Sequence, residues 1–315
     1  MSVVEKIKSA QSTAFSFELL PPLKGNGIDG VYRTIDALRE FDPKYINITT
    51  HRSELVFKET GNGLFERVAE RHRPGTVAIA AAIQNKYKIP VVPHIICSGF
   101  TKEETEYALI DLQFLGITDL LLLRGDKAKH EKQFAATGHA HATELQAQVN
   151  KFNTGEFLDG SKMKSLVTPF SYGMACYPEK HEEAPNMESE LYYAKMKVDA
   201  GAEYLVTQMF FDNKKYYEFV GKCKAAGINV PIIPGLKPVT FMNQLTVLPQ
   251  IFKTDIPEDF AAGLRKAKTD AEATEVGVEW CTMQARDLIA NGVPSIHFYS
   301  LMATQSVKRV AQAVY

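Results

Sequence analysis

The feature that most constrains the fold is a repeated alternation of short apolar runs with longer amphipathic stretches. Alternation of this kind predicts βα units and a parallel sheet, because a strand covered by helices on its outer face is apolar almost throughout. The eight predicted strands are Ala14–Phe17, Tyr45–Ile48, Val91–Ile96, Leu120–Leu123, part of Val167–Cys176, Tyr204–Thr207, Pro231–Ile233 and Ile296–Tyr299. Eight units predict the α/β class and, within it, a (β/α)₈ TIM barrel.

Two stretches interrupt the alternation, and we expect both to be loop insertions. They are Lys127–Asn153 and the charge-rich Phe252–Thr269. Neither is flanked on both sides by a Pro/Gly/Ser linker or is long enough for a second core. The sequence therefore predicts a single TIM-barrel domain over residues 1–315, without a regulatory domain.

Charge and cysteine content narrow the functional classes. The 36 Lys and Arg residues balance 37 Asp and Glu residues, which leaves no basic excess for a nucleic-acid partner. The four cysteines are far apart and form no C-x-x-C pair, as expected of reduced thiols in a cytoplasmic protein. The longest apolar run, Val77–Ile83, is too short to span a bilayer, so we expect neither a membrane segment nor an export signal.

Three short motifs partly match known cofactor-binding or metal-binding motifs, but the residues around them do not support the match. Gly25–Gly30 matches G-x-G-x-x-G, but Leu19–Lys24 separate it from the strand end at Glu18, and no ribose-binding acid ends the next strand, so we expect a loop. Gly155–Lys162 lacks the Lys-Ser/Thr of a P-loop. His139 and His141 have no third ligand at a recognisable spacing, so we expect a solvated loop and no metal.

Polar residues at the strand ends give a stronger signal, because a TIM barrel carries its chemistry at the carboxyl ends of its strands. They are Glu18, Thr49, His94, Arg124-Gly125-Asp126, Tyr177, Gln208 and Lys237. Glu18 lies between Phe17 and Leu19, so a poorly solvated carboxyl with a raised pKa is expected, as a general acid requires. The alternative is a carboxylate that caps nearby backbone.

The other strand ends also allow two interpretations. Arg124-Gly125-Asp126 suits a phosphate-bearing cofactor and a developing cation, or is an Arg–Asp pair in a tight turn. His94 is a ligand-orienting group or a core imidazole. Phe210-Phe211 is packing or a stacking platform for a flat heterocycle. Lys237, if desolvated, could attack a carbonyl, which makes a Schiff-base lyase or aldolase an alternative function.

The same residues lie in segments that together resemble the methylenetetrahydrofolate reductase family, in its short bacterial form. The similarity runs from about Phe15 to Ala303. Its carriers are FSFELLPP at 15–22, YINIT at 45–49, PHIIC at 93–97, LLLRGD at 121–126, ACYPEKHEEA at 175–184, KVDAGAEYLVTQMFFD at 197–212, IIPGLKPV at 232–239 and HFYSL at 297–301.

The resemblance implies a barrel that holds FAD at its mouth and uses NADH or NADPH as co-substrate. The implied reaction is a ping-pong hydride transfer that reduces 5,10-methylenetetrahydrofolate to 5-methyltetrahydrofolate and so feeds methionine synthesis. A flavin as hydride carrier would account for the missing dinucleotide fingerprint. A homo-oligomer is also implied.

Carried over by position, Glu18 matches the acid that assists opening of the folate ring to an iminium, and Asp126 the carboxylate near flavin and folate. Thr49 and Gln208 match residues shared by nicotinamide and folate, and Gln244 a further folate contact. The positions that match FAD contacts are Thr50, His94, Arg124, Gly125, Asp126, Ala142, Tyr177, His181, Ala184, Glu190 and Lys197. The positive charges of Lys197 and Arg124 make these side chains suitable contacts for the diphosphate of FAD.

Several positions depart from the family pattern. Met302-Ala303 stands where Asn-Arg is common, so a basic folate anchor is absent, and Lys308 or Arg309 is a candidate replacement. Tyr193 and Met196 replace an Asn and an Arg near FAD, and Leu23 replaces an Arg. These departures motivate a third hypothesis, a non-catalytic subunit that binds folate or flavin.

Overall fold

The structure is a computed structural model that describes residues 1–126, 138–165, 168–301 and 303–315. The described chain divides into two compact units, and each is described by itself. The first comprises Met1–Leu19, Arg33–Asn47 and Ser171–Tyr315, and the second Leu20–Tyr32 and Ile48–Phe170.

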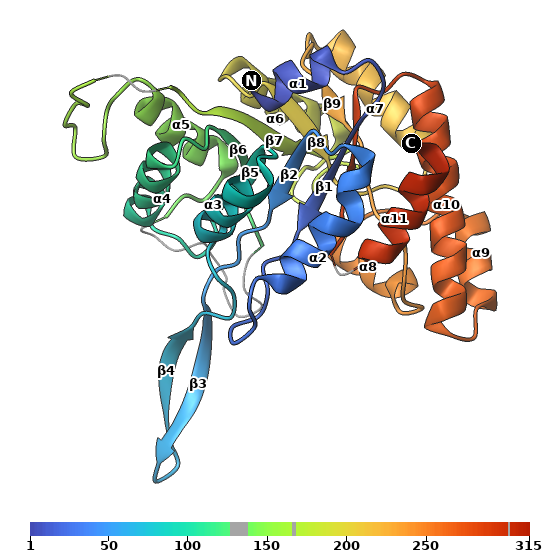
Figure 1. Cartoon of the computed structure of the whole chain (residues 1–315), viewed down its shortest axis with the longest axis horizontal. Coiled ribbons are helices and arrows are strands. Elements are labelled where there is room, and N and C mark those ends of the chain that lie inside the picture. Colours follow the sequence, from blue (N-terminus) through green and yellow to red (C-terminus); the bar gives the residue numbers. More distant parts are fainter. Residues whose placement is uncertain (127–137, 166–167, 302) are drawn as a thin grey trace. The chain divides into compact units, whose positions relative to one another are not determined.

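Helices and strands alternate along the chain (Figure 1). The strands are β1 (Ala14–Leu19), β2 (Tyr45–Ile48), β3 (Glu54–Gly61), β4 (Leu64–Glu70), β5 (Val91–Ile96), β6 (Asp119–Leu123), β7 (Ser171–Cys176), β8 (Tyr204–Thr207), β9 (Ile232–Ile233), β10 (Gly235–Leu236) and β11 (Ser295–Phe298). The helices are α1 (Val3–Ser9), α2 (Asp29–Leu38), α3 (Thr76–Tyr87), α4 (Lys102–Phe114), α5 (Ala142–Asn153), α6 (Met187–Asp199), α7 (Asn213–Ala225), α8 (Gln244–Phe252), α9 (Glu258–Lys266), α10 (Asp270–Ala290) and α11 (Thr304–Val314), and Arg39–Phe41 forms a 3₁₀ turn.

Nine of these strands form one sheet in the order β10-β11-β1-β2-β5-β6-β7-β8-β9. Each strand lies beside the next one of the barrel series, and the first strand pairs in parallel with the last, Phe17 opposite Phe298. This is the strand order of a (β/α)₈ barrel, so the predicted fold class is confirmed. Buried residues fill β1, β2 and β5 throughout, as strands covered on both faces require.

The seventh barrel strand is broken at a proline. The sequence predicts one strand at Pro231–Ile233, whereas the structure has two short strands, β9 and β10, on either side of Pro234. A proline lacks the N–H group that a ladder needs. The Pro234 carbonyl still accepts a hydrogen bond from the His297 N–H group at 2.9 Å, so the break leaves this stretch attached to β11.

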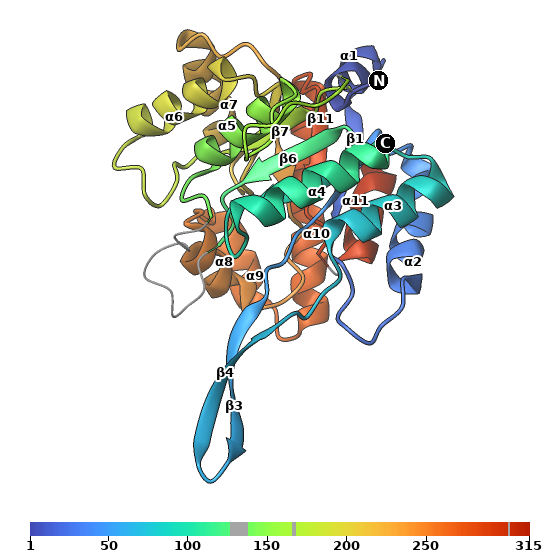
Figure 2. The same ribbon diagram turned by 90° about the vertical axis from the view of Figure 1, so that its left-hand side faces the viewer.

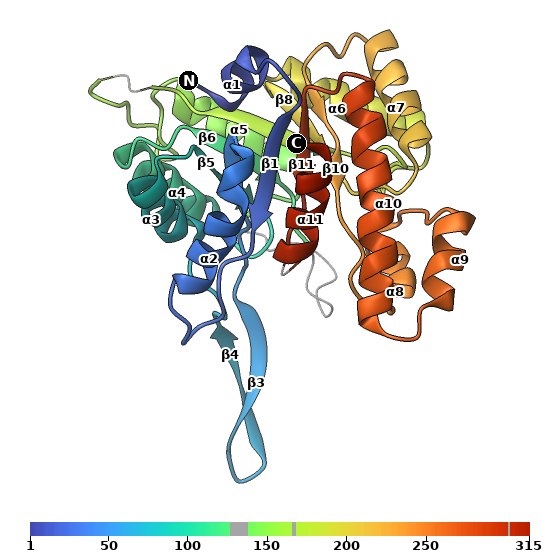
Figure 3. The ribbon, with the colours of Figure 1, turned by 45° about the vertical axis from the view of Figure 1, so that its right-hand side comes forward.

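A two-stranded antiparallel ribbon, β3–β4, is absent from the strand prediction. Its turn is Gly61-Asn62-Gly63, and all three residues have positive φ. In Figures 1, 2 and 3 the ribbon extends away from helices α3 and α4 of its own unit. An Asn-Gly turn with alternating residues on both sides predicts a β-hairpin, and this pattern is present in the sequence of the ribbon.

The two predicted insertions are partly regular structure. The first, Lys127–Asn153, ends in α5, which connects β6 to β7 as a barrel helix does, and its residues 127–137 lie outside the described residues. The second, Phe252–Thr269, contains α9, which packs beside α10 in Figures 1 and 3. The prediction of loop insertions is therefore wrong for the parts of these stretches that form α5 and α9.

Helix boundaries follow the sequence closely. Thr101 and Glu104 form a capping box at the start of α4, with reciprocal bonds of 3.1 and 2.8 Å. Gly116, Gly201, Gly227 and Gly292 follow the ends of α4, α6, α7 and α10, and all four have positive φ. Within the described ranges, no helix combines the length and the apolar character needed to cross a bilayer.

Candidate active site

Glu18 lies near the end of β1, in the first unit, and its side chain is buried. Only 6% of the residue is exposed, because Phe17 and Leu19 on either side belong to the core. Burial raises the pKa of Glu18 to about 8, and the positive charge of Lys237 opposes this rise. The expected raised pKa of Glu18 is thus confirmed, and the group can hold a proton at neutral pH.

Lys237 follows β10 in the same unit and is also 6% exposed. Burial lowers the pKa of Lys237, and the neighbouring Glu18 carboxyl opposes that change. Glu18 and Lys237 are 219 residues apart in the sequence, and each one shifts the pKa of the other.

Gln208 follows β8, and the chain around it is fixed by neighbouring strands. The Tyr299 hydroxyl donates to the Thr207 carbonyl oxygen at 2.6 Å, and the Gly235 N–H group donates to the Thr207 hydroxyl at 2.9 Å. Burial raises the pKa of Tyr299 well above its usual range, so its hydroxyl stays a donor. Tyr299 was missed by sequence reasoning, although it lies in HFYSL at the end of the last strand.

Gln244, predicted to contact folate, begins helix α8. Its side-chain oxygen accepts hydrogen bonds from the N–H groups of Thr240, at 2.8 Å, and Phe241, at 3.2 Å. The oxygen thus stabilises the turn before the helix, and the amide NH₂ group is the part that suits a ligand acceptor. Its predicted folate contact stays a prediction.

Five predicted FAD positions are close in sequence within the first unit: Tyr177, His181 and Ala184 lie in the connection after β7, and Glu190 and Lys197 lie in α6. The rings of Tyr177 and His181 meet edge to face at 4.7 Å, and the N–H group of His181 donates to Glu190 Oε2 at 3.2 Å. Burial raises the pKa of Glu190, and Lys197 opposes this. The Lys197 ammonium also donates to the Ala175 carbonyl at 2.8 Å.

In the second unit, Thr50 and His94 lie together in the wall of a cavity of about 510 Å³. The Thr50 hydroxyl donates to the main-chain oxygen of His94. Residues of α3 and α4, among them Thr76 and Thr105, complete the wall. The volume is within the range of cofactor pockets, which is ≈ 300–1,000 Å³. Thr49 lies beside this segment and shares a hydrogen bond of 3.1 Å with His51.

Arg124-Gly125-Asp126 forms a tight turn after β6. Gly125 has φ of 74°, and a Cβ atom there would lie 3.1 Å from the Ser98 side chain. Ser98 holds both ends of the turn: its N–H group donates to the Arg124 carbonyl at 3.0 Å and its hydroxyl to the Asp126 carbonyl at 2.5 Å. The turn thus directs the polar side chains of Arg124 and Asp126 from a fixed backbone.

Ala142 is the first residue of α5, after the N-cap residue His141. His139, just before it, is buried and shares a hydrogen bond of 2.5 Å with Gln148. The prediction of a solvated loop is therefore wrong for His139, whose imidazole is satisfied inside the second unit. Within the described ranges, no three His, Cys, Asp or Glu side chains are arranged to bind a metal.

Other sequence expectations are resolved by local packing. Phe210 and Phe211 are buried, and Phe211 packs on Phe260, whose ring stacks on Trp280 at 4.7 Å, so these residues form core. All four cysteines are buried, free thiols. The Gly25–Gly30 motif lies in the turn before α2 and in its first residues.

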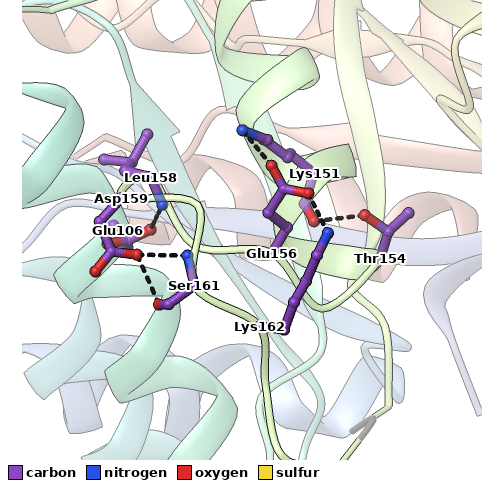
Figure 4. A network of polar contacts seen from close by, with 8 residues as sticks. All are labelled: Glu106, Lys151, Thr154, Glu156, Leu158, Asp159, Ser161 and Lys162. Atoms are coloured by element: carbon purple, nitrogen blue, oxygen red, sulfur yellow. Dashed lines mark hydrogen bonds and ion pairs between the residues drawn. The ribbon is translucent and has the colours of Figure 1, made fainter.

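The segment that resembles a P-loop is a polar turn (Figure 4). Glu156 binds Lys151 and Lys162, and the latter lies opposite it in an antiparallel bridge. Asp159 accepts two hydrogen bonds from Ser161, at 2.8 and 2.6 Å. Within residues 138–165 no helix begins at Gly160, so this stretch lacks the loop-to-helix arrangement of a P-loop.

Two departures from the family pattern, Tyr193 and Met196, and both candidate folate anchors lie on helices. Lys308 pairs with Glu40 at 2.7 Å, and Arg309 makes two hydrogen bonds to Glu275 at 2.7 and 2.6 Å. Tyr193 and Met196 are exposed on α6, and Ala303 is buried at the start of α11. Met302 lies outside the described residues. Both candidate folate anchors therefore have acidic partners within the first unit.

The family model and the similar proteins found by comparison all belong to one family. The family model described as methylenetetrahydrofolate reductase matches residues 3–314. "Methylenetetrahydrofolate reductase (NADH) 1" of Arabidopsis thaliana is 30% identical over 97% of this chain and 49% of its own length. "5,10-methylenetetrahydrofolate reductase" of Escherichia coli is 29% identical over 91% of this chain and 85% of its own. The chain thus spans about half the length of the plant relative.

A solved structure supports the fold. The protein described as "Uncharacterized protein from Clostridium thermocellum binds two copies of 5-methyl-5,6,7,8-tetrahydrofolic acid" aligns over 98% of this chain and 97% of its own, with a TM-score of 0.57 and 15% identity. At this identity the similarity concerns the fold alone. Because the family model covers nearly every residue, the chain belongs to the methylenetetrahydrofolate reductase family.

Proposed function

We propose that the protein reduces 5,10-methylenetetrahydrofolate to 5-methyltetrahydrofolate with NADH or NADPH as reductant and FAD as cofactor. The observation that carries this proposal is Glu18, a buried carboxyl whose pKa of about 8 keeps it protonated at neutral pH. The reaction needs an acid at the folate ring and a cofactor that carries hydride. Its product is a methyl donor for methionine synthesis in the cytoplasm.

The residues present fit FAD in two places. In the second unit, the cavity lined by Thr50 and His94 has the volume and the largely apolar wall that an aromatic cofactor needs. In the first unit, buried Glu190 has one carboxyl oxygen, Oε1, without a hydrogen-bond partner among the described residues. We assign FAD binding to Thr50, His94, Arg124, Gly125, Asp126, Ala142, Tyr177, His181, Ala184, Glu190 and Lys197.

When bound, FAD would supply the hydride chemistry, as the carrier between the nicotinamide and the folate. Glu18 donates its proton to the folate ring nitrogen that leaves the methylene carbon, so the five-membered ring opens to a cationic iminium. Asp126 supplies negative charge that favours this cation. Thr49, Gln208 and Gln244 bind and orient the nicotinamide or the folate. Because one site serves both substrates in turn, ping-pong kinetics are expected.

The test is an anaerobic titration of the FAD-loaded protein, followed by visible absorption. The flavin absorption should bleach with NADH or NADPH and return when methylenetetrahydrofolate is added. Glu18→Gln should leave the bleaching intact and slow the return by roughly 10²–10⁴-fold, the usual contribution of a general acid. Glu279→Gln, a change at an exposed carboxylate of α10, is the matched control. A protein that takes up no FAD, or a Glu18→Gln variant that matches the control, would refute the proposal.

Lys237 favours a second candidate. An amine whose pKa is lowered by burial can attack a carbonyl, as in a Schiff-base lyase. Borohydride trapping with a carbonyl substrate, compared between the native protein and Lys237→Met, separates this candidate from the reductase. An adduct confined to the native protein would favour the lyase.

A further inference from the structure

The segment between β7 and α6 is tied to the connection between α8 and α9 through the carboxyl group of Glu179. The Thr254 hydroxyl donates to Glu179 Oε2 at 2.7 Å, and the N–H group of Asp255 donates to the same oxygen at 3.2 Å. Thr254 is 1% exposed, so the anchor itself is buried. All three residues belong to the first unit, and the two bonds hold the Glu179 side chain in place.

The other carboxyl oxygen of Glu179, Oε1, is buried and has no hydrogen-bond partner among the described residues. A buried polar atom in a native protein is nearly always satisfied, either by the protein or by ordered water. Burial raises the pKa of Glu179, and the bonds from Thr254 and Asp255 oppose this rise. An ionised Oε1 needs a donor and a protonated one needs an acceptor, and a water molecule can serve as either.

The space for one water molecule lies beside this carboxyl group. The structure has a cavity of about 10 Å³ there, and its lining includes Glu179 and Thr254, and also Gln208, the residue that follows β8. One water molecule needs a volume of about 10–15 Å³. A nicotinamide, pterin or flavin ring is far larger than this, so the cavity is a site for water and not for a substrate or cofactor.

The side chain of Gln208 has a group that can bind the same water. Its oxygen accepts a hydrogen bond from the N–H group of Met209 at 2.9 Å, so the NH₂ group is the end available to other partners. An NH₂ group donates two hydrogen bonds, so one N–H can bind a water molecule in the cavity and the other can bind a ligand. The orientation of this amide matters because Gln208 is predicted to serve both the nicotinamide and the folate.

We propose that Glu179 is a positioning residue that acts through one ordered water molecule, which bonds to Glu179 Oε1 and accepts a hydrogen bond from the Gln208 NH₂ group. The carboxyl group holds the water, and the water fixes the amide of Gln208. Because Thr254 and Asp255 hold the carboxyl group, the connection between α8 and α9 helps to align the substrates without contacting them. The inference rests on the proposed function for the role of Gln208.

A crystal structure of the free protein, at a resolution that places water molecules, tests the water site directly. One water should lie within hydrogen-bond distance, about 2.5–3.2 Å, of both Glu179 Oε1 and the Gln208 side-chain nitrogen. A small cavity without water, or an Oε1 atom hydrated only from a neighbouring cavity of about 190 Å³ that Glu179 also lines, would overturn the proposal. This result depends on neither FAD nor turnover, so it separates the inference from a failure of the proposed function.

Steady-state kinetics of the FAD-loaded protein test the effect on the substrates. Glu179→Leu removes the atom that holds the water, and Thr254→Val removes a bond that holds the carboxyl group. Each variant should raise the KM for NADH and the KM for methylenetetrahydrofolate by about 2- to 12-fold, the range of one hydrogen bond, with a smaller change in kcat. Thr254→Ser keeps the hydroxyl group and should keep the wild-type values.

A Gln208→Ala background separates positioning from a general structural effect. Because Glu179 acts through Gln208, adding Glu179→Leu to Gln208→Ala should raise neither KM further. A further rise of the same size as in the single variant, or unchanged KM values in Glu179→Leu itself, would overturn the proposal.

Glu218→Gln is the matched control, because Glu218 is an exposed carboxylate that lines the larger cavity and is absent from the described lining of the small one. Both of its KM values should equal those of the wild type. Circular dichroism of every variant shows whether the fold is retained.

Discussion

The carboxyl group of Glu18 and the ammonium group of Lys237 are buried together, and each shifts the protonation of the other. Burial acts on both groups against their charged forms, whereas their mutual attraction acts in favour of charge. The proton affinity of Glu18 is therefore adjustable through Lys237 without any change at Glu18 itself.

Replacing Lys237 by Met should shift the pH profile of folate reduction upward. Glu18 acts as an acid only while protonated, so the rate falls as pH rises through the pKa of Glu18, which is about 8. Because Lys237 lowers the pKa of Glu18, its removal moves this alkaline limb to higher pH. Stopped-flow measurement of the folate half-reaction between pH 6 and 10 checks the shift. Lys237→Arg keeps the positive charge and should keep the limb, whereas equal loss of activity in both variants would indicate an essential amine.

Glu18→Gln should change how stability depends on pH. The pKa of Glu18 is about 8 in the folded protein and close to 4.5 in the unfolded chain, so between these values the unfolded chain loses the proton first. The free energy of unfolding then falls as pH rises, by at most about 1.4 kcal/mol per pH unit from this group. Urea unfolding at pH 5, 6, 7 and 8 should show a smaller decline in the variant. Parallel declines in both proteins would contradict the prediction.

Two Gly→Ala changes in helices should have opposite effects. A Cβ atom on Gly277 in α10 would collide with the backbone of Val239, two residues after Lys237, whereas nothing lies within 4 Å of one on Gly221 in α7. Gly277→Ala should therefore destabilise by roughly 2–4 kcal/mol. Gly221→Ala should stabilise by roughly 0.5–1 kcal/mol, because alanine is the better helix former. Thermal and urea unfolding of both variants would show the difference in sign.

Thr101→Ala should lower stability by about 1 kcal/mol, because the N-cap of α4 loses the bond from the Glu104 N–H group. Thr101→Ser retains an oxygen at the same place and should lose little. Urea unfolding of the two variants provides the comparison, and an alanine variant as stable as the serine variant would argue against the cap.

The sequence predicted the barrel because its strands are buried on both faces, so most of their residues are apolar. The ribbon was missed for the same reason: β3 and β4 are exposed on both faces and show no core pattern. Glu18 was found from its immediate neighbours, Phe17 and Leu19, which are local information. Tyr299 was not found from the sequence. Its hydrogen bond to Thr207 joins residues 92 positions apart, and only the folded sheet brings them together.

The pairing of β1 with β11 also has a consequence during protein synthesis. Phe17 leaves the ribosome early, but its partner Phe298 is made 281 residues later, which takes about 15–60 s at 5–20 residues per second. Throughout that interval the apolar residues of β1 lack the neighbour that covers their edge. A nascent chain of this kind is a natural client for chaperones, and codon changes that slow its last hundred residues should increase aggregation during translation.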